Sequence, residues 1–187
     1  MKIAITGHTK GIGKALKEFF EQRGHCVIGF SSSTGYNLSS HEDRQRILQE
    51  LGEFDVFINN AYSPLGQTAM LTSIIDLWTS TPNTIVNINS KSTLMAMPPP
   101  FMQEYVREKL EQKNIVASRF FKGSPHIINV TLGLVDTDMA KVFNSKKLTT
   151  SDVAALIYHL VSIRDVVAVQ DILIEVPGLD WDSIKTV

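Results

Sequence analysis

A tyrosine and a lysine stand four residues apart, at Tyr105 and Lys109. On a helix this spacing places both side chains on one face, one turn apart. A tyrosine hydroxyl ordinarily keeps its proton up to a pKa of about 10, and a neighbouring ammonium lowers this pKa because it stabilises the phenolate. Tyr105 can then donate or accept a proton near neutral pH. The alternative is a surface helix that carries both residues by chance, so other residues must decide.

A serine precedes this pair, at the end of the segment Asn87-Ile88-Asn89-Ser90. A hydroxyl at the end of a strand can donate a hydrogen bond to a polarised oxygen. Alone, such a serine is more often part of an ordinary loop. Together with Tyr105 and Lys109, Ser90 predicts a site that orients and protonates a substrate oxygen.

The segment Thr6-Gly7-His8-Thr9-Lys10-Gly11-Ile12-Gly13 follows the apolar run Ile3–Ile5 and precedes a helix pattern. Glycines between a strand and a helix let the backbone approach a phosphate closely, and the new helix points its free N–H groups at that phosphate. An ordinary tight turn would also use glycine. The strand before and the amphipathic helix after favour a phosphate site.

The rest of the chain alternates between strand and helix patterns. We expect strands over Lys2–Thr6, Cys26–Phe30, Asp55–Asn59, Thr84–Asn89, His126–Thr131 and Asp171–Glu175. We expect helices over Gly13–Gln22, Ser40–Leu51, Gln67–Thr79, Phe101–Phe121 and Ser151–Val161. Strands that are apolar on both faces and alternate with helices predict a parallel α/β sheet covered on both sides. Ligands bind such sheets at the carboxyl ends of the strands, where the glycine turn, Asn60 and Ser90 all fall.

Composition narrows the class of protein. The 187 residues predict one domain over 1–187, and the net charge of −1 argues against a nucleic-acid or anionic membrane partner. No apolar run approaches the roughly 20 residues of a membrane-spanning helix, and the first residues lead directly into a strand, so we expect a cytoplasmic protein. Cys26 is the single cysteine and the five histidines are scattered, so we expect no metal site.

These motifs, in this order, resemble the short-chain dehydrogenase/reductase family. The matching segments are Thr6-Gly7-x-x-x-Gly11-Ile12-Gly13, Asn59-Asn60-Ala61, Ser90, Tyr105-x-x-x-Lys109 and Gly133-Leu134-Val135-Asp136-Thr137-Asp138. The resemblance implies a Rossmann-like, doubly wound parallel sheet in a single compact domain. It also implies hydride transfer between a nicotinamide cofactor and a carbonyl or alcohol carbon.

The resemblance assigns roles by position. Tyr105 would be the general acid/base, Lys109 would lower its pKa and hold the nicotinamide ribose, and Ser90 would orient the substrate oxygen. The implied cofactor-binding residues are Gly7, His8, Thr9, Lys10, Gly11, Ile12, Gly13, Ser31, Ser32, Asn37, Leu38, Asn60, Ala61, Tyr105, Lys109, Val135 and Thr137.

The end of the second expected strand bears on the choice of cofactor. NAD sites usually carry an acidic residue there, which holds the ribose 2′-hydroxyl. Here Phe30 is followed by three serines from Ser31 to Ser33, and Lys10 adds a positive charge in the glycine turn. The arginine that NADP-using members often place near Ser32 is missing. We expect NADP(H) to be favoured over NAD(H).

Several positions depart from the family pattern. Tyr62 replaces a glycine, Leu132 replaces a proline, and one helix pattern separates Asn60 from Ser90 where the family has two. The family's fourth active-site residue, an asparagine, has no clear counterpart, and Gln67 is a poor substitute. The alternative function is therefore a non-catalytic dinucleotide-binding or sensor protein. A relative of nucleotide-sugar epimerases fits less well because its glycine spacing differs.

The expected partners are a small-molecule carbonyl or alcohol substrate and further copies of the chain. A pocket lined by Tyr62, Met95, Met97, Phe101 and Met139 would suit an apolar or aromatic substrate. The expected helices 67–79 and 101–121 carry apolar residues that look exposed, namely Trp78, Met102 and Phe120. We therefore expect a homodimer or homotetramer.

Overall fold

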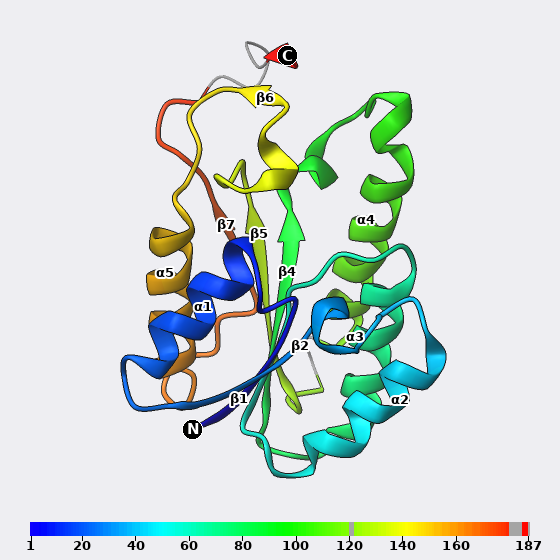
Figure 1. Ribbon diagram of the computed structural model, residues 1–187, viewed down its shortest axis with the longest axis vertical. Coiled ribbons are helices and arrows are strands. Elements are labelled where there is room, and N and C mark those ends of the chain that lie inside the picture. The colour runs from blue at the N-terminus through cyan, green and yellow to red at the C-terminus, as the bar shows by residue number, and fades with distance from the viewer. Residues whose placement is uncertain (120–121, 180–184, 187) are drawn as a thin grey trace.

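Six parallel strands form the central sheet of the computed structural model, which describes residues 1–119, 122–179 and 185–186 (Figure 1). The strands are β1 (Lys2–Thr6), β2 (Cys26–Phe30), β3 (Val56–Asn59), β4 (Thr84–Ser90), β5 (His126–Leu132) and β7 (Asp171–Ile174). Their order across the sheet is β2-β1-β3-β4-β5-β7. The chain first turns one way from β1 to β2 and then returns past β1 to β3. Such a reversal opens a crevice at the carboxyl ends of the strands.

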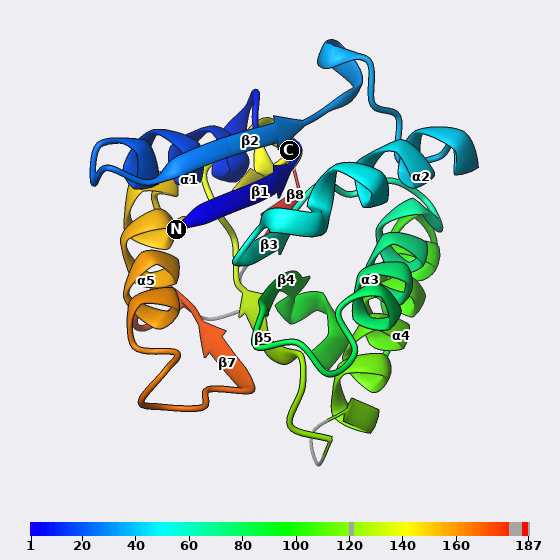
Figure 2. The ribbon, with the colours of Figure 1, turned by 90° about the horizontal axis from the view of Figure 1, so that it is seen from below.

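Helices cover both faces of the sheet, as Figure 2 shows. One face carries α1 (Gly11–Glu21) and α5 (Thr150–Ser162), and the other carries α2 (His41–Glu50), α3 (Gly66–Leu77) and α4 (Gln103–Arg119). The predicted doubly wound α/β fold is confirmed. Within the described ranges, no helix is long and apolar enough to span a membrane.

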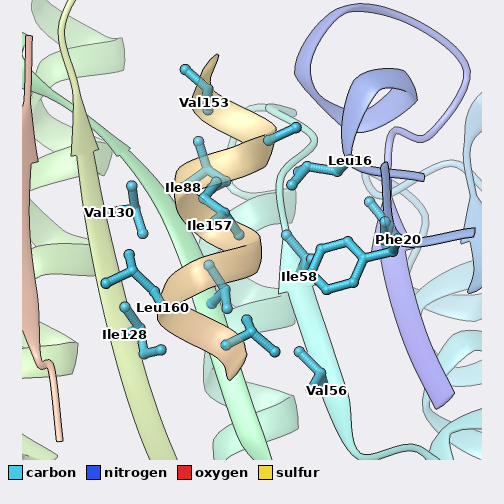
Figure 3. Close-up of a cluster of buried hydrophobic side chains, with 14 of the residues drawn as sticks. Leu16, Phe20, Val56, Ile58, Ile88, Ile128, Val130, Val153, Ile157 and Leu160 are labelled. Atoms are coloured by element: carbon cyan, nitrogen blue, oxygen red, sulfur yellow. The ribbon is translucent and has the colours of Figure 1, made fainter. Parts of the chain in front are cut away.

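Two apolar cores lie on the two faces of the sheet. In the first, Leu16 and Phe20 of α1 and Ile157 of α5 pack onto the strand residues Ile58 and Ile88 (Figure 3). The second core lies under α2, α3 and α4. Because each central strand is buried on both sides, its sequence is a continuous apolar run and not an alternating one.

Element ends differ from expectation where turns compete with helices. Helix α1 begins at Gly11 and not Gly13, since Lys10 is its N-cap. Helix α4 begins at Gln103 because Pro100–Met102 forms a separate 3-10 turn. Its expected end at Phe121 lies outside the described residues. A short antiparallel pair, β6 (Phe143–Asn144) with β8 (Lys185–Thr186), was not expected.

The expectation that Trp78 is exposed is wrong. Its side chain is 3% exposed and packs edge-to-face on Phe57, with ring centroids 6.4 Å apart. Trp78 directly follows α3, and the apolar residues of this helix pack onto the sheet. Met102 is half-buried, and Phe120 lies outside the described residues. The homo-oligomer stays a prediction.

A buried row of amides crosses the sheet. Asn59, Asn87 and Asn129 are paired in register on β3, β4 and β5, and Asp171 of β7 continues the row. Each side-chain Nδ2 donates to the next side-chain oxygen at 3.0 Å, and the last bond ends on the Asp171 carboxylate. The bonds all point the same way, so each one polarises the next.

Replacing Asn87 with alanine leaves buried groups of Asn59 and Asn129 without their partner. We expect Asn87→Ala to lower the free energy of unfolding by about 2–4 kcal/mol, as measured by urea denaturation. The matched control is Asn114→Ala, which removes an exposed asparagine of α4 and should change stability by less than about 0.5 kcal/mol. Equal stability of the two variants would contradict a structural role for the row.

Candidate functional site

The structure brings Ser90 and Tyr105 together. Ser90 ends β4, and Tyr105 lies in the first turn of α4. The Ser90 Oγ accepts hydrogen bonds from the backbone N–H of Ser92 at 3.2 Å and from the Ser92 hydroxyl at 2.9 Å. Its own proton is left free to donate, and its interaction with the Tyr105 hydroxyl opposes the rise that burial causes in the pKa of Tyr105. Two hydroxyls thus face one position at the carboxyl edge of the sheet.

Lys109 lies one turn further along α4 and is buried, with 3% exposure. Its Nζ donates to Gln67 Oε1 at 2.6 Å and to the Ile88 carbonyl at 2.8 Å. It lies 5.7 Å from the centroid of the Tyr105 ring. Burial lowers the pKa of Lys109 to about 7, and the negative charge of Glu108 opposes this shift. A lysine with this pKa is only partly charged at neutral pH.

The expectation that Lys109 lowers the pKa of Tyr105 is not met in this structure. Burial raises the pKa of Tyr105, and the hydrogen bond from Ser90 is the opposing influence. The reason is geometric and electrostatic: the Lys109 ammonium points at Gln67 and Ile88, and its own charge is weakened by burial.

Gln67 has a larger part in the site than the sequence indicated. It is fully buried on α3 and contacts Lys109 directly. Its Nε2 donates to the Asn59 carbonyl at 3.0 Å and to the Ile88 carbonyl at 3.1 Å, so its Oε1 is fixed toward the ammonium. A glutamine among the apolar residues of α3 is the one sequence signal that marks this position.

The backbone of the glycine turn leaves little room for side chains. Gly7 and Gly11 have φ values of +72° and +50°, which side chains rarely adopt. A Cβ on Gly13 would overlap the carbonyl of Gly7. A Cβ on Gly7 would lie 2.9 Å from that of Ala61, and one on Gly11 would lie 3.2 Å from the Thr137 methyl.

Thr6 connects this turn to the segment after β3. Asn60 Nδ2 donates to the Thr6 carbonyl at 2.9 Å, and the Ala61 N–H donates to Thr6 Oγ1 at 3.0 Å. Asn60, Ala61 and Thr137 therefore all lie directly against the glycine turn. The Thr137 hydroxyl donates to the carbonyl of buried Val135 at 3.3 Å.

Hydroxyl groups gather at the end of β2. Ser33 Oγ lies 2.8 Å from Ser31 Oγ and donates to Thr9 Oγ1 of the glycine turn at 3.2 Å. Ser32 begins the short 3-10 turn that holds this cluster, and Thr34 also belongs to it, although nothing in the sequence pattern marks this threonine. No carboxylate belongs to this described hydroxyl cluster.

The other predicted cofactor residues are placed as follows. The His8 ring packs so closely on Gly29 of β2 that a side chain there would overlap it, and burial lowers the pKa of His8. Ile12 packs onto the α1–α5 core. Leu38 is buried in the second core, so only its backbone can face a ligand, and Asn37 is held by Asp43 at 2.9 Å.

One depression in the described surface lies apart from these residues. It has a volume of about 700 Å³ and lies between the 95–98 segment and the outer side of α4, where Met95, Val106 and Leu110 line it. Three expected pocket residues, Met97, Phe101 and Met139, are exposed. Among the described residues no cluster of acidic, histidine or cysteine side chains could hold a metal ion.

Comparisons with known proteins support the fold. A scan of protein-family models found no match to the sequence, and a search of curated proteins found none either. Solved structures do match. A 3-alpha-hydroxysteroid dehydrogenase from a Pseudomonas species, complexed with NADH, matches with a TM-score of 0.78 and 17% identity, over 94% of this chain and 95% of that chain.

Two further structures agree. A short-chain dehydrogenase from Burkholderia cenocepacia in complex with NADP matches with a TM-score of 0.73 and 17% identity, over 92% of this chain and 87% of that one. An alcohol dehydrogenase from the archaeon Thermococcus sibiricus, complexed with 5-hydroxy-NADP, matches with a TM-score of 0.72 and 18% identity, over 93% of this chain and 96% of that chain. The chain has the fold of short-chain dehydrogenases, so the resemblance seen in its motifs is confirmed at the level of fold.

The buried lysine makes stability depend on pH. Between about pH 7 and its ordinary pKa of 10.5, Lys109 is neutral in the folded state and charged in the unfolded state. The unfolded state then binds more protons, so the free energy of unfolding rises with pH through this window. We expect the penalty for burying Lys109 to become smaller from pH 7 to 10.5. We expect Lys109→Met to lose this rise of stability with pH. Urea unfolding at several pH values measures it; parallel curves for both proteins would contradict the buried, weakened charge.

Proposed function

We propose that this chain is an NAD(P)-dependent oxidoreductase of the short-chain dehydrogenase/reductase family. It transfers a hydride between nicotinamide and a carbonyl or alcohol carbon. The observation that carries the proposal is that Ser90 and Tyr105 interact through their hydroxyls beside buried Lys109. The glycine turn at the same edge of the sheet fits a dinucleotide, since its backbone is bare where side chains would block a phosphate. Bound NADH and NADP in similar structures agree with this assignment.

The cofactor supplies the hydride when bound, and the chain supplies position and proton transfer. The turn from Gly7 to Gly13 and the N-terminus of α1 would hold the diphosphate. Ser90 donates to the substrate oxygen and orients it. Tyr105 then gives its hydroxyl proton to that oxygen during reduction and takes it back during oxidation.

The remaining predicted residues line the ends of the cofactor. Asn60, Ala61, Asn37 and Leu38 would contact the adenosine half. Val135 and Thr137 would contact the nicotinamide end. Lys109 would hold the ribose hydroxyls with the N–H that is not donated to Gln67 or Ile88.

A non-catalytic dinucleotide-binding or sensor protein is the second candidate. The raised pKa of Tyr105 favours it, because a phenol that holds its proton more tightly is a weaker general acid. The two candidates share the cofactor site and differ in turnover.

Tyr105→Phe separates them, because it removes the hydroxyl and keeps the ring. We expect the variant to bind NADPH as the wild type does and to lose about 10²–10⁴-fold in turnover. Oxidation of NADPH over a panel of apolar and aromatic carbonyl compounds measures turnover, and cofactor fluorescence measures binding. Wild type and variant that bind NADPH equally and are equally inactive would leave only the sensor function.

We further propose that NADP(H) is preferred over NAD(H). The hydroxyls of Ser31, Ser33 and Thr9 can donate to a 2′-phosphate, and no carboxylate among them would repel it. Lys10 directly follows Thr9 in the sequence, and its exposed side chain supplies a positive charge.

The charge of Lys10 can be tested by Lys10→Ala. We expect this variant to bind NADPH about tenfold more weakly or worse, because a charge-assisted contact is lost, and to bind NADH unchanged. Lys14→Ala is the matched control, since Lys14 is an exposed lysine of α1 that pairs with Glu18 at 3.7 Å. Equal loss of affinity for both cofactors would contradict a contact with the 2′-phosphate. Titration of cofactor fluorescence gives both constants.

The partner of the chemistry is a small-molecule carbonyl or alcohol, apolar or aromatic in character. The exposed side chains of Met97, Phe101 and Met139 at this end of the molecule support that choice. A homodimer or homotetramer in the cytoplasm completes the proposal.

A further inference from the structure

Glu108 is a carboxylate buried next to the active-site lysine. It is 1% exposed, and its Oε1 accepts a hydrogen bond from the backbone N–H of Leu65 at 3.0 Å. Leu65 has a left-handed φ of +58° and immediately precedes α3. An anion at this place is favoured because the N-terminus of a helix is electrically positive. Glu108 thus fastens α4 to the turn from which α3 begins.

That turn carries two groups of the site. Tyr62 precedes it and packs edge-to-face on Tyr105, with ring centroids 4.9 Å apart. Gln67 follows it and accepts from Lys109. A left-handed leucine is an unfavourable backbone conformation that neighbouring contacts must hold in place. The bond from Leu65 to Glu108 is the contact that joins this conformation to the helix of Tyr105 and Lys109.

The second oxygen of Glu108, Oε2, is buried and has no hydrogen-bond partner among the described residues. A single backbone N–H therefore compensates the carboxylate, and its negative charge acts on its surroundings at low dielectric. The other groups around the Lys109 ammonium are the rings of Tyr62 and Tyr105, at 5.9 and 5.7 Å, the amide of Gln67, and a backbone carbonyl. These groups are neutral at pH 7, so Glu108 is the charge that favours the ammonium.

We propose that Glu108 is a positioning residue of the reaction: its hydrogen bond to the Leu65 N–H fixes the turn that brings Tyr62 and Gln67 to the site, and its negative charge favours the ammonium of the adjacent Lys109. This inference rests on the proposed function for its role in turnover. Its effect on Lys109 belongs to the chain alone, and can be measured without cofactor or substrate.

The test is a titration of Lys109 by NMR, in protein labelled with ¹³C at lysine Cε. The Lys109 signal is the one missing from Lys109→Met. We expect Glu108→Gln to lower the titration midpoint of Lys109 by about one pH unit, because an opposite charge has been removed. Glu111→Gln, which neutralises an exposed glutamate one turn or less away on α4, should leave the midpoint unchanged. Circular dichroism checks that each variant is folded.

Glu108→Asp separates charge from position. It keeps the carboxylate but shortens the reach to Leu65, so we expect a midpoint closer to wild type than that of Glu108→Gln. A midpoint in Glu108→Gln equal to that of wild type would overturn the proposal, even if the enzyme turns over. The pH profile of NADPH binding should shift with the NMR midpoint. Wild type without any NADPH binding or turnover would instead overturn the proposed function, and the titration would still decide whether Glu108 controls Lys109.

Discussion

The site depends on one physical constraint: an ammonium buried between a helix and a sheet must find acceptors. Lys109 finds them in the Gln67 side chain and the Ile88 carbonyl. Each acceptor is fixed in turn, since Gln67 is bonded to the carbonyls of Asn59 and Ile88, and Asn89 Nδ2 donates to the Lys109 carbonyl at 3.1 Å. The lysine therefore ties α4 to α3 and to β4, and Gln67 continues the connection to β3. Tyr105, on the same face of α4, inherits its position beside Ser90 from this arrangement.

The polar network continues beyond the lysine, and it explains why amides occupy strands that should be apolar. Asn87 receives a bond from Asn59 and donates onward to Asn129. Gln112, one turn after Lys109 on α4, accepts from Asn87 at 3.4 Å. Buried amides of this kind are favourable when their donors are satisfied and costly when they are not. The network therefore favours one register of α4 on the sheet over its neighbours.

The sequence predicts the sheet well and the contacts within the site poorly, for a physical reason. Buried parallel strands are apolar runs that local pattern reveals, and the Tyr105–Lys109 spacing is itself a local property. Gln67 and Glu108 matter through partners 42 and 43 residues away, which no local pattern encodes. Trp78 was misjudged for the same reason, since its burial depends on Phe57. At the end of β2, the sequence shows three serines, but the hydrogen bond from Ser33 to Thr9 forms only because folding brings the glycine turn beside them.

One departure from the family pattern is explained by this geometry. The sequence lacks the expected asparagine, yet Gln67 meets the lysine directly, because its longer side chain reaches from α3 to the ammonium. A direct contact with a neutral amide stabilises the ammonium less than an ion pair would. The burial that comes with it leaves Lys109 with a pKa of about 7. Such a lysine can help Tyr105 only to the extent that it remains charged, and the nearest charge that favours this is the buried carboxylate of the preceding residue. In this chain the charge of Lys109 is therefore set by the balance between its burial and the negative charge of Glu108, while burial and Ser90 set the pKa of Tyr105.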